Sequence, residues 1–499
     1  MPLAVAALAL ACSGGEPTGD LAPLVRFESN QVSDTVGTLL SQPLIVRVNA
    51  PRGTPVVFRA DSVPWLTGGI VPSVYFMRSP NGPSVRETDT LTTDANGRVS
   101  VYARLGGVAA KAVVTAVLPT LGDSAQMQID ILPGPPARIV AAPSDTAVYV
   151  GRAYALRTSL TDGYGNSLPI GAVTIQSDST SVTVQADGKI SGQTIGRARI
   201  VVRSGTFTAT VWASVVPQGR IAARADRASG APSTALVLVN LDGSAYRSFP
   251  LQPLDAPHPS WHPSGGYLVA SLLPTPGSPN PVQRLAALDT ATGQWRSLPG
   301  SGSTFGDGQP VFSRDGQWIY LGNPASNSAY SDRSVIYRVR SDGSGTAEQV
   351  GYDQRQGITY DDPSPSPDGT RVAMTFEGSS GMYTLITPAS PPLGTPPGEA
   401  ILVGSLPTGG HPYWSPVSDD VLMFGTEGMW LMTAGARTIS DRRYLASAVA
   451  GATGGFTSAA WSPDGKWIVA RSGSGLILVE VATDRVIPLP FGSQLANPA

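Results

Sequence analysis

The sequence predicts an all-β protein in which two β-sandwiches precede a β-propeller. Three observations support this prediction. Glycine and proline supply 56 and 45 of the 499 residues without a Gly-x-y period, which indicates a turn-rich globular chain and excludes collagen. Apolar and polar residues alternate in short runs up to about residue 216. Beyond that point, a pattern roughly 50 residues long repeats along the chain.

The charge balance narrows the classes of function. Lys and Arg number 34 and Asp and Glu 36, so the formal net charge is −2, and only 14% of residues are charged. Nucleic-acid binders and proteins held on a membrane surface by basic patches need a marked positive excess. Chains that are disordered because of their charge carry many more charged residues. We therefore expect a folded protein with no nucleic-acid partner.

The N-terminal residues predict export and lipidation. The nine apolar residues Leu3–Ala11 are too few for a membrane span of about 20 residues but suit a signal peptide. Ala9-Leu10-Ala11-Cys12 resembles a bacterial lipoprotein lipobox, and Cys12 is the single cysteine. The resemblance implies a signal peptide over residues 1–12, a lipidated Cys12 and a tether over 13–22. The membrane would be reached through this lipid anchor only. The expected location is the cell envelope, at the outer membrane or periplasm of a diderm host, or outside the cell if the segment is a plain secretory signal.

Residues 23–133 are predicted to form the first β-sandwich. Val, Thr and Ala alternate with polar residues in short runs, which Gly, Pro, Asn and Asp separate. Within Leu91–Val99, the pair Asn96-Gly97 predicts a hairpin, because both residues accept positive φ. Leu91–Val99 and Gly53–Phe58 resemble segments of bacterial Ig-like domains of the invasin/intimin type. The resemblance implies an Ig-like sandwich.

A second sandwich is predicted over residues 134–216. The preceding segment Leu132–Pro136 has three prolines in four positions, which cannot continue a strand, so we place a boundary there. Thr161–Asn166, Val184–Gly192 and Gly196–Ile200 are similar to segments of a related bacterial Ig-like class. The resemblance implies that two Ig-like domains form a stalk.

From about residue 217 onward, the chain contains six copies of one unit. The clearest copy has Trp461-Ser462-Pro463-Asp464-Gly465, followed by apolar runs at Trp467–Ala470, Leu476–Val479 and Arg485–Ile487. A copy at Ile221–Gly243 lacks its first strand. The remaining copies begin at Trp261, Phe312, Pro365 and Trp414. From Trp261 to the clearest copy at Trp461, successive copies start 51, 53, 49 and 47 residues apart.

This period, with three or four short strands per unit, predicts a β-propeller over residues 217–499. Each blade is a sheet with two apolar faces, and stacking in a ring covers both. In the Pro-Asp-Gly turn, proline presets φ and glycine accepts positive φ. We expect the tryptophan of each copy to pack between blades. The incomplete first copy needs one more strand, either from Val211–Val216 or from the residues after Phe491.

The copies resemble the repeats of TolB-type propellers, in which W-S-P-D-G opens each of six blades. The resemblance covers about 280 residues. TolB has an α/β domain where this chain has the Ig-like segments, so the resemblance implies the propeller fold and not the translocation role of TolB. The predicted fold class is therefore all-β, with two Ig-like β-sandwiches followed by a six-bladed β-propeller.

The sequence lacks the common catalytic motifs. We find no G-x-S-x-G nucleophile elbow, P-loop, H-E-x-x-H or paired C-x-x-C. Three histidines and one cysteine offer little material for a zinc site. We therefore predict no enzymatic activity, no cofactor and no metal.

Two histidines occupy the same position in different copies. His258 and His411 each lie three residues before the tryptophan of their copy. The chain that leads into the innermost strand of a blade borders the central channel. We call these equivalent positions the channel mouth, and they are predicted to form either a polar binding site or a solvated rim. The residues are His258, Gln309, Asp362, His411 and Ser458.

The sequence thus predicts a non-catalytic cell-envelope lipoprotein. Its Ig-like stalk would present a propeller that binds a protein or peptide partner, with a glycan as the second candidate. Two alternatives stay open: a surface adhesin that acts through the Ig-like domains, and a metal-dependent propeller enzyme, a lyase or hydrolase. The adhesin would keep its surface binding without residues 217–499. The enzyme would need the channel mouth to bind a metal.

Overall fold

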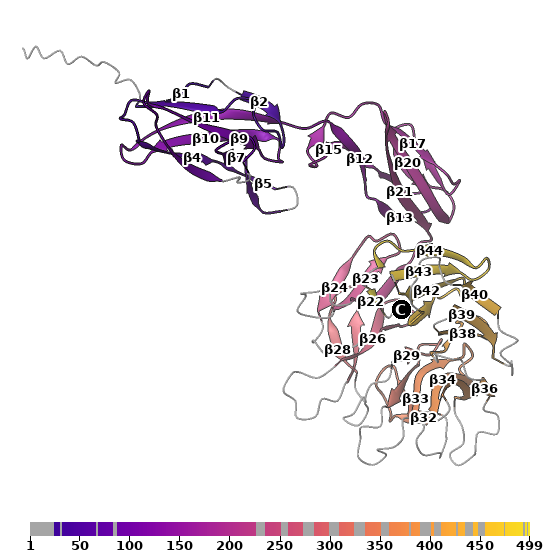
Figure 1. Ribbon diagram of the computed structural model, residues 1–499. Coiled ribbons are helices and arrows are strands. Elements are labelled where there is room, and N and C mark those ends of the chain that lie inside the picture. Colours follow the sequence, from indigo (N-terminus) through magenta and orange to yellow (C-terminus); the bar gives the residue numbers. More distant parts are fainter. Residues whose placement is uncertain are drawn as a thin grey trace, which may run out of the picture. The chain divides into compact units, whose positions relative to one another are not determined.

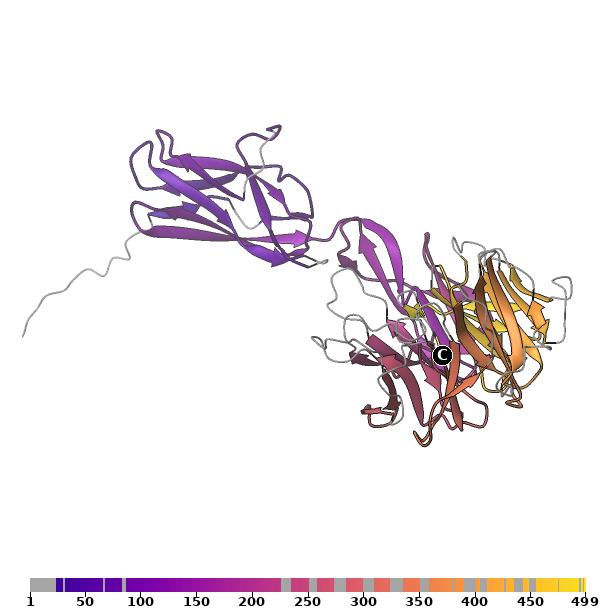
Figure 2. The ribbon, with the colours of Figure 1, turned by 90° about the horizontal axis from the view of Figure 1, so that it is seen from below.

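The computed structural model contains strands and no α-helix among the described residues, so the predicted all-β class is confirmed (Figures 1 and 2). No helix that could cross a membrane occurs in this part of the chain. The predicted signal peptide, Cys12 and the tether lie outside the described residues. The structure describes residues 24–29, 32–65, 68–82, 87–225, 235–250, 258–272, 284–298, 309–323, 335–350, 359–378, 381–389, 401–403, 411–425, 428–434, 443–447, 455–473, 475–492, 495–496 and 498–499.

The chain divides into two compact units. The first comprises Met1–Val140, Thr158–Val173 and Arg203–Ala209, and the second comprises Ala141–Arg157, Thr174–Val202 and Thr210–Ala499. The residues of the second predicted sandwich, 134–216, are therefore shared between the units. The domain boundaries read from the sequence stay a prediction.

Two sheets form a sandwich in the first unit. Their strand orders are β1-β3-β9-β7 and β2-β11-β10-β4-β8. Buried residues recur at every second position of β9 (Arg98–Leu105) and β10 (Ala110–Leu118), so one face of each sheet lines a shared core. The other strands are β1 (Val25–Phe27), β2 (Val32–Thr35), β3 (Leu44–Val48), β4 (Pro55–Ala60), β7 (Val74–Met77), β8 (Thr88–Thr92) and β11 (Asp123–Leu132), with a small hairpin of β5 (Ser62–Pro64) and β6 (Ile70–Pro72).

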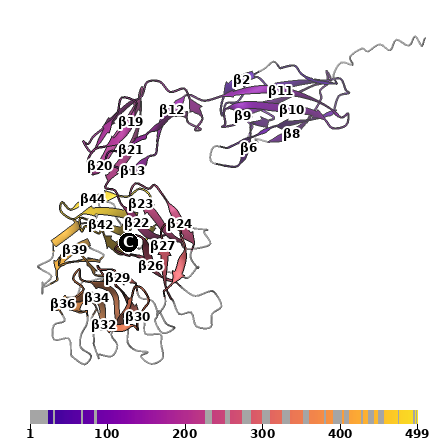
Figure 3. The ribbon, with the colours of Figure 1, turned by 180° about the vertical axis from the view of Figure 1, so that it is seen from behind.

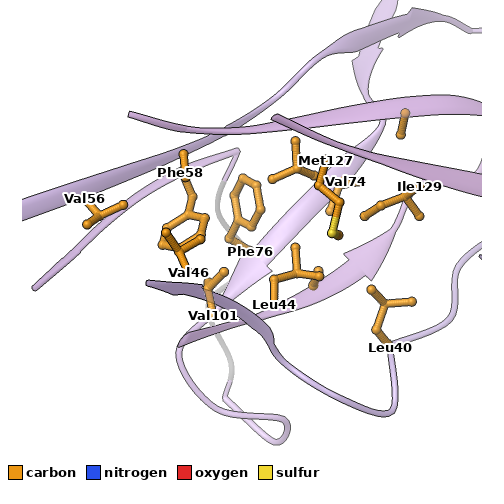
Figure 4. Close-up of a cluster of buried hydrophobic side chains, with 14 of the residues drawn as sticks. Leu40, Leu44, Val46, Val56, Phe58, Val74, Phe76, Val101, Met127 and Ile129 are labelled. Carbon is orange, nitrogen blue, oxygen red and sulfur yellow. The ribbon is translucent and has the colours of Figure 1, made fainter. Parts of the chain in front are cut away.

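Two phenylalanines lie at the centre of this core. The rings of Phe58 and Phe76 have centroids 5.9 Å apart, and both side chains are fully buried (Figure 4). Leu44 and Val46 of β3 and Val101 of β9 belong to the same buried cluster (Figure 4). Phe58 comes from one sheet and Phe76 from the other, so their contact joins the two layers.

The hairpin predicted at Asn96-Gly97 is wrong, although the tight turn exists. Asp94 N donates to Arg98 O, and Gly97 has a φ of +69°. However, β8 before the turn and β9 after it belong to different sheets. After the turn, Val48 N of β3 donates to Gly97 O, so the chain pairs with β3 instead of folding back onto β8.

Residues 136–216 form ten strands in three sheets, with orders β12-β15-β16, β13-β21-β20-β17 and β14-β19-β18. Here the Asp187-Gly188 turn does make a hairpin, because β18 and β19 pair directly and Gly188 has a φ of +79°. The strands are β12 (Pro136–Ala142), β13 (Asp145–Tyr149), β14 (Ala153–Ala155), β15 (Arg157–Asp162), β16 (Ser167–Leu168), β17 (Thr174–Ser177), β18 (Val182–Val184), β19 (Lys189–Gly192), β20 (Gly196–Ser204) and β21 (Phe207–Val216).

The predicted linker around Pro133 is anchored by a buried carboxylate. Asp162, only 1% exposed, accepts hydrogen bonds from Gly134 N at 2.8 Å and from Tyr164 N and Asn166 N at 2.9 Å each. Asn166 in turn accepts Ala109 N through Oδ1 at 2.8 Å. The proline-rich segment therefore interrupts the strands, but its backbone is held in place by the hydrogen bond from Gly134 N to Asp162.

The described residues of the second unit include six four-stranded sheets, which lie side by side in a ring, as a six-bladed propeller requires (Figure 3). The innermost strands of blades 2 to 6 contact one another in succession. Blade 1 is β45 (Leu495–Ala496), β22 (Arg220–Ala225), β23 (Ala235–Asn240) and β24 (Arg247–Pro250). Blades 2 and 3 are β25 (Ser260–Trp261), β26 (Tyr267–Leu272), β27 (Arg284–Asp289), β28 (Trp295–Ser297), and β29 (Val311–Phe312), β30 (Trp318–Asn323), β31 (Val335–Arg340), β32 (Glu348–Val350). Blades 4, 5 and 6 are β33 (Thr359–Pro365), β34 (Arg371–Gly378), β35 (Gly381–Pro388), β36 (Ile401–Val403), then β37 (Tyr413–Trp414), β38 (Asp420–Gly425), β39 (Gly428–Thr433), β40 (Arg443–Ser447), and β41 (Ser458–Trp461), β42 (Trp467–Ser472), β43 (Gly475–Glu480), β44 (Arg485–Pro488).

The ring is closed by the C-terminal residues. Leu495 and Ala496 pair with Ala225 and Arg224 of β22, and Ala499 exchanges backbone hydrogen bonds with Ala222. Of the two sources expected for the missing strand of the first copy, the residues after Phe491 supply it.

The repeated tryptophan connects neighbouring blades, as the sequence predicts. Trp461 Nε1 donates to Tyr413 O of the preceding blade at 3.0 Å, and Trp261 Nε1 donates to Ala499 O of blade 1 at 3.1 Å. Each of these two indoles thus packs against a neighbouring blade and also satisfies a backbone carbonyl there.

Candidate functional site

The five predicted channel-mouth residues lie at the starts of innermost strands. His258 and Gln309 come two residues before β25 and β29, and His411 comes two residues before β37. Ser458 is the first residue of β41, whereas Asp362 lies within the longer β33. Residues that lie three positions before the first residue of the repeated motif therefore occupy equivalent positions at the innermost strands of their blades.

Asp362 and His411 form a direct pair across two blades. His411 Nδ1 lies 2.5 Å from Asp362 Oδ2, and the two side chains are 34% and 6% exposed. Thr375 of β34 fixes both partners, because its hydroxyl donates to Asp362 Oδ2 and accepts the His411 backbone N–H, each at 3.0 Å. The pair is therefore held rigidly by blade 4.

Both members of the pair have an unusual backbone. The φ angles are +52° at Asp362 and +30° at His411, a region that side-chain-bearing residues rarely adopt. Such strain of about 1–3 kcal/mol per residue persists only where the surroundings impose it, and it concentrates at functional sites.

The pair changes the charge state of its neighbours. Burial lowers the pKa of His258 to about 4, and attraction to Asp362 only partly opposes this, while the charges of Arg224 and His411 lower it further. His258 is therefore neutral at pH 7. The charges of Asp362, His411 and Arg224 all change the pKa of His258. These four side chains, which come from four different blades, therefore lie close enough to interact electrostatically.

His411 behaves in the opposite way. Burial alone would lower the pKa of His411, but the hydrogen bond to Asp362 and the charges of Asp362 and Asp361 outweigh burial, so its pKa is raised. The pKa values of the two equivalent histidines are thus displaced in opposite directions, downward at His258 and upward at His411.

The sequence analysis missed two members of this cluster. Asp361 directly precedes Asp362, and its carboxylate Oδ1 accepts the Asp362 backbone N–H at 2.9 Å. Arg224 lies on β22 opposite Ala496 of the closing strand. The acidic pair was visible in the sequence, but nothing there marked Arg224, because the first copy lacks the strand that defines the equivalent position.

Gln309 and Ser458 are less closely tied to the pair. Ser458 is 2% exposed, and its hydroxyl has no hydrogen-bond partner among the described residues. Gln309 is half-buried.

His262, which stands in the serine position of its copy, bonds to Ser264 Oγ through Nδ1 at 2.8 Å and stacks on Tyr267, so it is a turn residue.

No group of three or more His, Cys, Asp or Glu side chains in the described part of the chain is arranged to hold a metal ion. At the channel mouth, His411 Nδ1 is engaged by Asp362.

The fold defines a β-propeller protein, and solved structures to which the chain is similar belong to several kinds of propeller protein. They include TolB from Acinetobacter baumannii (13% identity, TM-score 0.42, covering 72% of this chain and 98% of that one). They also include a periplasmic gluconolactonase from Pseudomonas aeruginosa (15%, 0.33, 54% and 81%) and an oligogalacturonate lyase in complex with manganese (13%, 0.33, 72% and 99%). No family model and no curated protein matches the chain. The propeller fold itself is defined by the six four-stranded sheets.

Proposed function

We propose that the propeller is a non-catalytic recognition module that binds a protein or peptide partner at the channel mouth. The observation that carries this proposal is the pair of the buried Asp362 and the partly exposed His411, which has strained backbone at both residues and lies near His258 and Arg224. Ionisable groups with displaced pKa values gather preferentially at functional sites. A purely solvated rim would leave such groups exposed, with ordinary pKa values.

The cluster suits an extended partner. Its members come from the ends of strands in blades 1, 2, 4 and 5, so a ligand that contacts them spans several blades. Loops and strand ends on a rigid scaffold are common places for recognition residues. A peptide or a protein loop offers both hydrogen-bond donors and acceptors over this width, which supports a protein partner before a glycan.

The location in the cell envelope is part of the same proposal. The lipobox-like residues before Cys12 support lipidation there, with the following segments as a spacer. In cells fed a labelled fatty acid, the full chain should acquire label and sediment with membranes, and Cys12→Ala should do neither. A labelled Cys12→Ala protein would contradict lipidation at this residue.

The partner can be sought by capture from a solubilised envelope extract. The bait is soluble protein that starts at Ser13, beside a variant with His258→Ala, Asp362→Ala and His411→Ala. Since Asp362 is buried, a milder variant, Asp362→Asn with His411→Gln, should be run in parallel, and far-UV circular dichroism should verify folding. Asp123→Asn, a change in the first unit, is the matched control.

A partner captured by the parent and the control, and lost by both folded channel-mouth variants, would support the proposal. Equal capture by all four proteins would contradict it. In that case binding would belong to other loops or to the sandwiches, as expected for an adhesin.

A further inference from the structure

Two consecutive aspartates are presented by an irregular strand. Asp361 of β33 is opposite Thr375 of β34, but the next paired residue is Ser364, so the register shifts between them. A strand irregularity of this kind redirects side chains and is frequent beside functional sites. Here it brings the neighbouring carboxylates of Asp361 and Asp362 to the same end of blade 4.

The two carboxylates are not equally neutralised. Asp362 has His411 as its ion-pair partner. Within the described residues, the hydrogen bond recorded for Asp361 comes from the backbone N–H of Asp362, a neutral donor. Burial and the charge of Asp362 raise the pKa of Asp361 to about 6, and attraction to His411 only partly offsets them. Above pH 6 the half-buried Asp361 therefore carries a negative charge, and no described residue forms an ion pair with it.

Two buried oxygens of the channel mouth have no hydrogen-bond partner among the described residues. They are Asp362 Oδ1 and Ser458 Oγ. Asp362 and Ser458 are themselves 6% and 2% exposed. Tyr413 lies close by, since its hydroxyl bonds to the backbone of Ala459, which follows Ser458, and the charge of Asp362 raises its pKa. Buried acceptors are almost always satisfied, so the carboxylate oxygen Asp362 Oδ1 can accept a further donor.

We propose that the Asp361–Asp362 end of the channel mouth receives a cationic side chain of the partner, the ammonium of a lysine or the guanidinium of an arginine. This inference rests on the proposed function of the channel mouth. A cationic nitrogen group brings both elements that the site lacks, a positive charge for Asp361 and several N–H donors. It meets Asp361 first, because Asp361 is the more exposed of the two aspartates.

An acidic side chain is the competing ligand. Arg224, and His411 when it is protonated, contribute positive charge to the same cluster. However, His411 is already paired with Asp362, and a carboxylate placed at this end would face the charge of Asp361. The observations therefore favour the cation.

Short peptides can test the charge preference directly. The probes are acetyl-Gly-Gly-X-Gly-Gly-amide with X as lysine, arginine, norleucine or glutamate, so that the X side chain alone can be charged. Binding is measured by calorimetry at pH 7.5 to the soluble chain, to Asp361→Asn and to Asp123→Asn as the control. We expect the lysine or arginine peptide to bind the parent and the control at least tenfold more tightly than the norleucine peptide. Asp361→Asn should lose this preference while remaining folded.

Equal binding of the lysine, arginine and norleucine peptides by the parent, or an unchanged preference in Asp361→Asn, would overturn the inference. The proposed function fails differently, through unchanged partner capture by the channel-mouth variants. If the glutamate or norleucine peptide binds best and His411→Gln removes that binding, the channel mouth stands as the site and the cationic ligand is rejected.

Discussion

Titratable side chains of the channel mouth respond to the same surroundings in different directions. Asp361, with a pKa raised to about 6, is destabilised in its charged form, first by burial and then by the charge of Asp362. His411 gains a proton more readily than a free histidine because of Asp362, whereas burial keeps His258 neutral down to about pH 4. Each difference between the pKa of a group in the folded protein and its pKa in the unfolded chain makes the free energy of unfolding depend on pH.

We predict that Asp361→Asn stabilises the protein at pH 8 but not at pH 3.5. The folded pKa of about 6 exceeds the ordinary 3.8, so the charged carboxylate destabilises the folded protein. This destabilisation is absent below about pH 4, grows as the pH rises and is complete above about pH 6. The cost is at most about 3 kcal/mol, from about two pKa units. Thermal unfolding of parent and variant at the two pH values measures it. An equal melting temperature at pH 8 would show that the Asp361 charge is already compensated.

The histidines define the controls for this experiment. The raised pKa of His411 adds stability that is present below about pH 6.5 and lost as pH rises through the folded value, in the same direction as Asp361. The lowered pKa of His258 acts oppositely, because stability present above pH 6.5 is lost as pH falls toward 4. His258→Gln should therefore reduce the loss at acid pH and leave the effect of Asp361→Asn at pH 8 unchanged.

At the scale of the element, the repeated Ser-x-Asp-Gly turn is a hydrogen-bonded unit. In blade 4, Ser366 Oγ donates to Asp368 Oδ1 at 2.6 Å and accepts Arg371 N at 3.0 Å, and Gly369 has a φ of +71°. The hydrogen bond from Ser366 and then that from Thr370 N lower the pKa of Asp368 to about 2. The same bonds occur at Ser313 and Asp315 and at Ser462 and Asp464. The repeat is thus preserved because it closes the turn between the first two strands of a blade.

We predict that Ser366→Ala lowers the free energy of unfolding by about 1–3 kcal/mol, because it removes the fully buried hydroxyl that accepts the Arg371 N–H. The exposed Ser124→Ala is the control, with an expected change within about 0.5 kcal/mol. Denaturant unfolding measures both. Equal midpoints for the two variants would show that the turn geometry survives without the serine.

The stability of the whole propeller depends on residues far apart in sequence. Leu495 of the closing strand is 3% exposed and packs in one cluster with Val216, Val237 and Leu478. Arg471 also donates to the Leu495 carbonyl. Tyr149 OH bonds to Gly219 O at 3.1 Å and Ser214 Oγ to Pro488 O at 3.0 Å, so strands β13 and β21 are also bonded to residues beside blades 1 and 6. Tyr149 and Ser214 therefore attach strands that precede the propeller to its first and last blades.

We predict that Leu495→Ala lowers the free energy of unfolding by about 2–5 kcal/mol, the usual effect of a buried leucine truncation. It should also weaken partner capture, since Arg224 of the channel mouth lies on the strand that β45 closes. Leu121→Ala, at a half-exposed position, should change neither. Thermal unfolding and the capture assay test this. Unaltered unfolding of Leu495→Ala would mean that the ring stays closed without this contact.

Much of the architecture is determined locally, and the sequence by itself therefore indicates it. Alternation in Arg98–Leu105 and the Trp-Ser-Pro-Asp-Gly copies identify strands and blades, because side-chain period and turn chemistry act over a few residues. The equivalent positions of His258, Asp362 and His411 follow from the same periodicity. Residues 217–499 could thus be assigned to a propeller without any long-range information.

Only the tertiary structure decides how these segments pair. It joins β9 to β3 rather than to β8, takes the last strand of blade 1 from the C-terminal residues, and brings Arg224 and Asp361 into the channel mouth. Hydrogen bonds between distant strands and the electrostatics of buried charges depend on spatial neighbours, and local residue patterns do not contain that information. The 2.5 Å contact between His411 and Asp362 is such a case, since the two residues lie in different blades.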